Sequence, residues 1–237
     1  MDISDTFENE DLDIRLGYVG LMSENYGTLT YGKQYSTSRL LTTWTDTGVS
    51  RMSANDAVTE RLRQSNILKY NIEPLNGLVV GIDRQFEYSN DFYDRVKGGN
   101  YGLVYELTSH LSAGALYSHQ KAKLSTGEQS DTNTYMLGAQ YQYDAFSAAV
   151  VIDKTNEKSG LGDYKAIETS ISYDIANYRF VTRFMKRNSD LDTQDVETIT
   201  FGVNYKLNKH LDILSEFNSS IQNHDFNQFT IAAKYRF

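Results

Sequence analysis

Residues 198–207 read TITFGVNYKL, and apolar and polar side chains alternate along them without a break. One set of alternate positions holds Ile199, Phe201, Val203, Tyr205 and Leu207, and the other holds Thr198, Thr200, Gly202, Asn204 and Lys206. A period of two residues is typical of a β-strand with one apolar face, whereas a helix would repeat every ~3.6 residues. This segment therefore predicts an amphipathic strand.

The same alternation continues along most of the chain and predicts about 13 strands. The expected strands span residues 11–22, 26–36, 65–72, 77–88, 99–107, 111–121, 133–143, 145–154, 164–174, 177–187, 196–207, 210–221 and 227–237. In the first of them, Leu16 and Tyr18 are expected on the apolar face and Arg15 on the polar face. The last reaches Phe237, with Phe229, Ile231, Ala233 and Tyr235 on the same face.

Two kinds of connection alternate between these strands. Short polar turns are expected at 23–25, 73–76, 108–110, 144–145, 175–177 and 208–210, and longer polar loops at 88–99, 123–133, 156–163 and 188–195. Each pair of strands would then have a short turn at one end and a long loop at the other. This asymmetry is typical of transmembrane β-barrels.

Composition excludes several classes of protein. The 237 residues carry a net charge of -8, which argues against a surface for nucleic acid, and the chain has no cysteine for thiolate metal sites, disulfides or nucleophiles. It contains 18 tyrosines and a single proline, which favours strands. No run approaches the roughly 18 apolar residues of a membrane helix, but a transmembrane barrel shows only short alternating segments.

A soluble β-sandwich or a lipocalin-like barrel would also have alternating strands. Here the polar faces are rich in Gly, Ser, Thr, Gln and Asn, as expected of a wet lumen. The opposite faces carry Tyr and Phe near strand ends and Leu, Ile, Val or Ala between them, which is the layout of an aromatic girdle around an apolar band. The sequence is therefore interpreted as all-β, a transmembrane antiparallel up-and-down β-barrel.

The stretch RLGYVGLMSENYGTLTYGKQYS at 15–36 resembles the general porin family of Gram-negative outer membranes. That family has a similar Arg-Leu strand, a short turn and a Tyr-Gly-rich strand, followed by a long loop that folds into the barrel. Residues 65–82 (SNILKYNIEPLNGLVVGI), 98–107 (GGNYGLVYEL) and 232–237 (AAKYRF) also match porin strands in order. The resemblance implies one barrel domain over 1–237, with residues 36–64 as an inward-folded constriction loop.

Full porins of this class have about 16 strands, and the first strand here resembles their fourth. The chain is therefore expected to hold about 12–13 strands of a 16-stranded type and to lack the N-terminal three, or, if one strand is miscounted, to close as a 12-stranded barrel. Its N-terminal MDISDTFENEDLDIRL is acidic and has no apolar core of a secretory signal.

A diffusion pore needs a constriction whose width and charge filter solutes, and no catalytic group. In porins, acidic residues of the inward loop face basic residues of the wall. The resemblance implies a constriction formed by Arg15, Lys69, Asp46, Asp56, Glu60, Arg61 and Arg63. Arg15 aligns with one of the wall arginines of the family. Lys69 lies at an alternate position that points to the lumen. The remaining residues are chosen only because they lie in or next to the inward loop. The loop charges could instead be solvated or hold the loop to the wall.

Three further arginines share the lumen parity of one strand, at Arg179, Arg183 and Arg187. They are predicted to form a basic ladder in the lumen, where they either draw anions inward or balance lumen acids such as Glu216.

An outer-membrane enzyme is the competing class, and it would need a nucleophile with a histidine base. The four histidines, at 110, 119, 210 and 224, have no Ser and Asp or Glu partners at a readable spacing, so no enzyme activity, cofactor or metal is expected.

The predicted function is an outer-membrane channel for passive diffusion of ions and small hydrophilic solutes. An oligosaccharide-selective porin, a non-conducting truncated barrel and an adhesin or phage-receptor role remain alternatives. Expected partners are outer-membrane lipid and lipopolysaccharide, small solutes, a possible homotrimer, and the barrel-assembly machinery, which would read Tyr235 and Phe237 as its signal.

Overall fold

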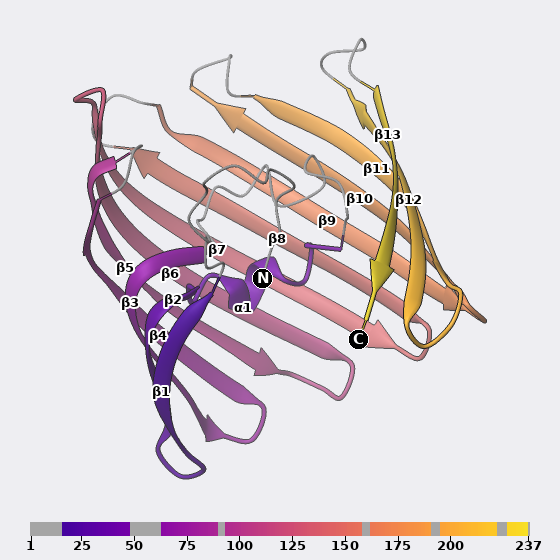
Figure 1. The fold of residues 1–237 in the computed structure, drawn as a ribbon, viewed down its shortest axis with the longest axis horizontal. Coiled ribbons are helices and arrows are strands. Elements are labelled where there is room, and N and C mark those ends of the chain that lie inside the picture. The colour runs from indigo at the N-terminus through magenta and orange to yellow at the C-terminus, as the bar shows by residue number, and fades with distance from the viewer. Residues whose placement is uncertain are drawn as a thin grey trace, which may run out of the picture.

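The computed structural model describes residues 16–47, 63–89, 93–157, 162–190, 195–221 and 227–236. Within them, one sheet of 13 strands runs from β1 to β13 in the order of the chain (Figure 1). Every pairing between neighbours is antiparallel, so the topology is up-and-down. The prediction of an all-β, up-and-down fold is confirmed.

The strands lie close to the predicted ranges. They are β1 (Gly17–Ser23), β2 (Gly27–Tyr35), β3 (Arg63–Leu75), β4 (Leu78–Tyr88), β5 (Tyr93–Glu106), β6 (Leu111–Leu124), β7 (Gln129–Tyr143), β8 (Phe146–Glu157), β9 (Tyr164–Ile175), β10 (Tyr178–Ser189), β11 (Val196–Lys206), β12 (Leu211–Ser220) and β13 (Asn227–Tyr235). A one-turn helix, α1 (Arg39–Thr42), follows β2. No helix in the described ranges has the length and apolar character to span a membrane.

The sheet curves into a trough, and α1 lies on its concave side (Figure 1). Strands β1 and β13 are its two edges, and the pairings between described residues do not join them. The convex face carries the large apolar side chains, including Leu137, Ile152, Ile171, Phe201 and Ile231, all exposed. Buried polar side chains point to the concave face, so the sheet is apolar outside and polar inside, the reverse of a soluble barrel.

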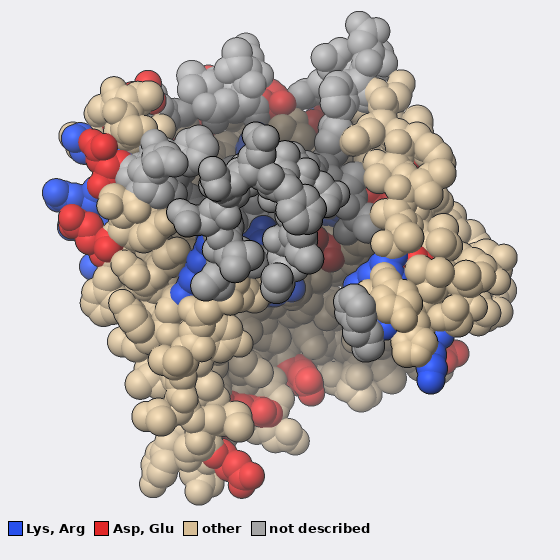
Figure 2. All heavy atoms as spheres, in the orientation of Figure 1, with Lys and Arg blue, Asp and Glu red and all other residues tan. Residues whose placement is uncertain are grey.

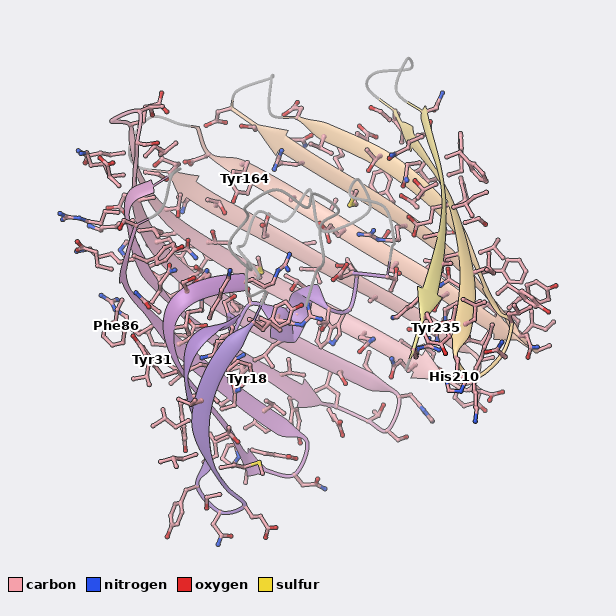
Figure 3. The ribbon with its side chains drawn as sticks, in the orientation of Figure 1. Tyr18, Tyr31, Phe86, Tyr164, His210 and Tyr235 are labelled. Atoms are coloured by element: carbon pink, nitrogen blue, oxygen red, sulfur yellow. The ribbon has the colours of Figure 1, made fainter. Side chains whose placement is uncertain are left out.

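Aromatic rings gather near both ends of the convex face. Toward the long-loop end, the rings of Tyr101 and Tyr117 have centroids 6.3 Å apart, and those of Tyr117 and Tyr135 are 5.2 Å apart. Tyr31 and Phe86 form a similar contact at 6.5 Å, and both lie on the outer side in Figure 3. At the short-turn end His210 stacks on Tyr235 at 5.9 Å. Amphipathic rings at two levels mark the two interfaces of an apolar band.

The turns at one end are as short as predicted, and local backbone geometry makes them so. Ala176, in the turn between β9 and β10, has a φ of 50°, and Asp144, between β7 and β8, has a φ of 49°. A left-handed residue in a two-residue connection turns one strand directly into the next.

Two of the predicted long loops are wrong. Most of 88–99 belongs to β5, and most of 123–133 belongs to β6 and β7, so the connections there shrink to 89–92 and 125–128. Ion pairs between strands extend the sheet, as between Lys123 and Asp94 at 2.8 Å and between Lys121 and Asp131 at 3.1 Å. The residues at these strand ends are polar because the sheet continues beyond its apolar band. Their composition is therefore that of a loop although they form strands.

The face assigned to Tyr18 is also wrong. Residues opposite each other in an antiparallel pair point to the same face, and Tyr18 lies opposite Gly32 while Val19 lies opposite Tyr31. Because Tyr31 points outward, Val19 points outward and Tyr18 inward. Apolar residues occupy both the odd and the even positions of this strand, so alternation does not show which set of side chains points outward. Arg15 lies outside the described residues. Because it has the parity of Val19, alternation no longer supports its place on the lumen face, which stays a prediction from the family resemblance alone.

Candidate functional site

Residues 36–47 lie across the concave face, and we call them the strap. Half of the strap residues are buried, including Thr37, Leu41 and Thr45 at 0 % exposure. Serine and threonine side chains fold it locally, because they bond backbone groups one turn away. Thr43 Oγ1, for example, donates to the Arg39 carbonyl at 2.9 Å.

The strap begins at a carboxylate on the wall. The Thr37 amide donates to Asp83 Oδ2 at 2.5 Å, and Asn100 Nδ2 donates to Asp83 Oδ1 at 2.8 Å. Lys69 Nζ donates to the carbonyls of Tyr35 and Ser36 at 3.2 and 3.4 Å. Strands β3, β4 and β5 therefore fix the point where the chain leaves β2.

The middle of the strap packs on apolar wall residues. Leu41 forms a buried cluster with Leu116, Met136 and Val151, and Trp44 packs against it. Two glycines leave room for this contact. A Cβ on Gly114 would lie 2.5 Å from Leu41 Cδ2, and a Cβ on Gly138 would lie 2.9 Å from the Trp44 ring.

The far end of the strap bonds to β9. Thr45 Oγ1 donates to Glu168 Oε2 at 2.8 Å, and Thr47 Oγ1 lies 2.8 Å from Ser170 Oγ. The strap thus runs over the inside of the sheet from β4 to β9 and is bonded to the wall at both ends.

Charged groups remain accessible beside the strap. The Arg39 guanidinium lies 3.9 Å from the ring centroid of Tyr35, and its Nη1 is 4.0 Å from Asp46 Oδ2. The Arg39 side chain is 35 % exposed. Figure 2 looks onto this concave side, where Lys and Arg atoms lie in the middle of the hollow and Asp and Glu atoms lie toward its lower edge.

The structure brings two of the predicted constriction residues to the strap. Lys69 bonds its first residues, and Asp46 lies near its end beside Arg39. Arg63 is exposed at the start of β3, opposite Tyr35. The other four, Arg15, Asp56, Glu60 and Arg61, lie outside the described residues. A shared constriction of all seven therefore stays a prediction, as does the domain boundary that assigns 36–64 to one loop.

The three arginines of β10 differ in environment. Arg179 is exposed at the short-turn end and holds Asp174 through two bonds of 2.8 and 2.7 Å. Arg183 is 1 % exposed and donates to Met185 Sδ at 3.6 Å. Arg187 lies 5.9 Å from the ring of Tyr164, which is on the inner side near the long-loop end (Figure 3). Their action as one basic ladder stays a prediction.

Sequence reasoning missed Arg39, Asp83 and Glu168. Asp83 and Glu168 occupy alternate positions of their strands that point inward. An acidic residue at an inward position is the sequence signal by which each could have been found. Neither could be linked to the strap from sequence, because their partners lie 46 and 123 positions away.

The chain that folds into this up-and-down sheet, with an apolar outer face and a strap on its inner face, also matches a known family model. The model for Gram-negative porins covers residues 2–237. The chain belongs to this family. The resemblance inferred from the sequence is confirmed, and it places the chain in the Gram-negative outer membrane, among proteins that are channels rather than enzymes.

The curated relatives are distant in sequence. Outer membrane porin F of Xenorhabdus nematophila is 27 % identical over 163 residues, which cover 60 % of this chain and 44 % of the relative. Outer membrane porin C of Rahnella aquatilis is 27 % identical over 178 residues, covering 63 % of the chain and 52 % of the relative. The chain thus spans about half the length of these relatives.

Solved porins share the fold. OmpF of Salmonella typhi, in complex with daunomycin, superposes with a TM-score of 0.79 at 17 % identity, over 94 % of this chain and 78 % of that one. The trimer form of OmpT of Vibrio cholerae gives 0.76 at 14 % identity, over 97 % and 82 %. An anion-selective porin of Comamonas acidovorans gives 0.65 at 18 % identity, over 86 % and 66 %.

Proposed function

We propose that the chain forms the wall of a water-filled channel for passive diffusion of ions and small hydrophilic solutes across the outer membrane. The observation that carries this proposal is the strap, which is bonded at both ends to the inner wall and leaves Arg39 and Asp46 partly accessible. A segment fixed inside a barrel narrows it without closing it, and its charges bias which ions pass.

The constriction would combine the strap with the wall. Lys69 supports the start of the strap, and Arg39 and Asp46 present charges of both signs beside it. By resemblance, Arg15, Asp56, Glu60, Arg61 and Arg63 would contribute to the same eyelet, and Arg179, Arg183 and Arg187 would line the lumen above and below it. The protein would need no cofactor and would catalyse no reaction.

Its partners would follow from the same proposal. The exposed apolar face suits outer-membrane lipid, and a homotrimer would follow the trimer form described for OmpT of Vibrio cholerae. Tyr235 and Phe237 would serve as the signal to the barrel-assembly machinery, with Phe237 outside the described residues.

Planar-bilayer recording of the refolded chain tests the channel. We expect stepwise conductance, together with a heat-sensitive gel mobility that reports a folded barrel. A folded barrel that shows no steps at any applied voltage would overturn the proposal. Turnover of esters or peptides by the same sample would favour an enzyme instead.

A further inference from the structure

The convex face carries two lysines directly opposite each other near the long-loop end. Lys154 of β8 pairs with Lys165 of β9, and both side chains are exposed. Opposite residues on one face bring their Cβ atoms within ~5.5 Å, and like charges at this distance repel. The two lysines face outward, because their neighbours Asp153, Thr155 and Ala166 are buried on the inner face.

Three neighbouring lysines on this rim have carboxylate partners, whereas Lys154 and Lys165 form no ion pair with another described residue. Lys121, Lys123 and Lys186 bond Asp131, Asp94 and Glu197 at 3.1, 2.8 and 3.0 Å. In the described ranges, no carboxylate oxygen lies within 4.0 Å of the Nζ of Lys154 or Lys165.

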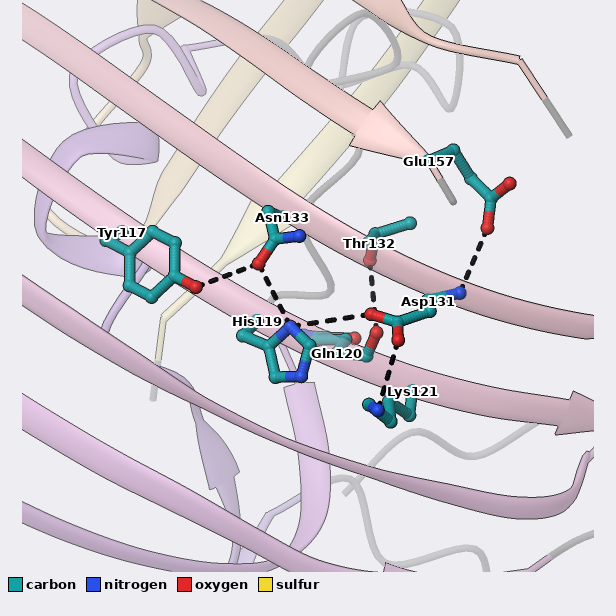
Figure 4. Close-up of polar contacts among 8 residues, drawn as sticks. All are labelled: Tyr117, His119, Gln120, Lys121, Asp131, Thr132, Asn133 and Glu157. Carbon is teal, nitrogen blue, oxygen red and sulfur yellow. Dashed lines mark hydrogen bonds and ion pairs between the residues drawn. The ribbon is translucent and has the colours of Figure 1, made fainter. Parts of the chain in front are cut away.

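A second lysine pair in the same sheet gives an internal comparison. Lys97 lies opposite Lys121, and the next residue across from Lys121 is Asp131. Figure 4 shows Asp131 beside Lys121 and His119, with its carboxylate oxygens 3.1 Å from Lys121 Nζ and 3.6 Å from His119 Nδ1. The residues that flank the pair of Lys154 and Lys165 are Tyr135 and Asn188, which carry no charge. A carboxylate thus lies directly across from one lysine pair, and uncharged residues lie directly across from the other.

The surface beside Lys154 and Lys165 has the shape and polarity of an amphipathic site. A groove of about 380 Å³ is lined by Tyr135, Leu137 and Ile152 together with both lysines. A polar hollow of about 420 Å³ is also lined by both lysines, together with Asn188 and Ser189. It also contains Asp163 and Asp190, and Asp163 accepts the amide of Glu157 at 2.7 Å.

We propose that Lys154 and Lys165 bind the phosphate of a phosphorylated glycolipid, the lipopolysaccharide of the leaflet at the long-loop end. The phosphate would lie between the two ammonium groups, and an acyl chain would follow Leu137 and Ile152 toward the middle of the membrane. Tyr135 belongs to the aromatic row with Tyr101 and Tyr117, which is the level of lipid headgroups. The proposal rests on the membrane setting of the proposed function, but the lysines lie outside the lumen.

Binding of bisphosphorylated lipid A to the delipidated protein in zwitterionic micelles tests the site. The Lys154→Gln/Lys165→Gln variant should bind roughly 20- to 30-fold more weakly, since each lysine near an anionic surface contributes about a fivefold factor. The matched control, Lys97→Gln/Lys121→Gln, removes the same charge from the pair that has Asp131, and it should lose less than about threefold. Equal losses in the two variants would mean generic surface attraction and overturn the site.

Three further measurements separate other readings. Dephosphorylated lipid A should bind wild type as weakly as lipid A binds the double variant, and equal binding of both lipids would overturn the role of phosphate. Inorganic phosphate that displaces lipid A at matched concentration would indicate a free-anion site instead.

Without lipid, the double variant should be at least as stable as wild type, because the repulsion between the two lysines is removed. A lower stability of the variant would contradict that repulsion. If the double variant does not fold, Lys165→Gln alone should show about a fivefold weaker binding.

Conductance distinguishes this inference from the proposed function. Both lysines are on the convex face, so the double variant should conduct as wild type does. Normal conductance with unchanged lipid A binding would reject the lipid site alone, and absent conductance in wild type would reject the channel alone.

Discussion

The hydroxyl of Thr45 donates a hydrogen bond of 2.8 Å to Oε2 of Glu168, and the two residues are 123 positions apart in the chain. This bond joins the strap to the opposite part of the wall. Trp44, the single tryptophan of the chain, is the preceding residue and packs over Gly138. Its fluorescence therefore reports where the strap lies.

Replacing Thr45 by Val should loosen the far end of the strap. Valine keeps the shape but removes the donor to a buried carboxylate, which should lower the free energy of unfolding by about 1–2 kcal/mol. Acrylamide should quench Trp44 more strongly in the folded variant, and open-channel current noise should rise. Thr43→Val is the matched control, because the Thr43 hydroxyl bonds within the strap at 2.9 Å. Equal quenching in the two variants would reject the anchoring role.

Replacing Gly138 by Ala should displace the strap from the wall. The new Cβ would lie 2.9 Å from the Trp44 ring, so the ring must move toward the lumen. Overpacking of this kind costs about 1–3 kcal/mol, and single-channel conductance should fall. In Gly202→Ala the Cβ meets nothing closer than 3.4 Å, which makes this inward glycine the control. A conductance change in Gly202→Ala as large as that in Gly138→Ala would contradict the contact with the strap as its cause.

Replacing Asp83 by Asn should release the start of the strap. The carboxylate accepts from Thr37 and from Asn100, whereas an amide has one acceptor oxygen and turns its NH₂ toward the other donor. The loss should be about 2–3 kcal/mol in the free energy of unfolding, measured by urea titration in micelles. Asp174→Asn breaks an exposed pair with Arg179 and should cost less than about 1 kcal/mol. A smaller loss for Asp83→Asn than for Asp174→Asn would show that Asp83 does not hold the strap.

The strands could be predicted closely because each has one face toward lipid and one toward the lumen, and the period of two is clear in most of them. It failed in β1, where Tyr18, Val19, Leu21 and Met22 put apolar side chains on both faces. The lengths of β5 to β7 were underestimated, because charged strand ends such as Lys121 and Asp131 have the composition of a loop.

The site was less predictable than the fold for a physical reason. Alternation shows that Asp83 and Glu168 point inward, but their role depends on where the strap crosses the wall. That path is fixed by contacts of Leu41 with Leu116, Met136 and Val151, which come from three different strands. The resemblance located the strap, and the structure was needed to find its bonds.

Arg39 should influence the charge preference of the channel. It is the partly accessible cation on the strap itself, stacked on Tyr35 at 3.9 Å and 4.0 Å from Asp46. Arg39→Gln removes a positive charge beside the pathway and leaves Asp46 unbalanced, so the permeability ratio of cations to anions should rise. Reversal potentials in a salt gradient measure this ratio. Arg39→Lys keeps the charge and should preserve the ratio, although the planar contact with Tyr35 is lost.

The control for Arg39 lies on the other face of the sheet. Lys123 bonds Asp94 on the convex side, so Lys123→Gln changes the net charge of the protein by the same amount without changing the lumen. Its reversal potential should equal that of wild type. Because lumen charges act within about 10 Å at 0.1 M salt, the effect of Arg39→Gln should shrink at 1 M salt. A shift that persists unchanged at high salt, or that appears equally in Lys123→Gln, would place the selectivity elsewhere than the strap.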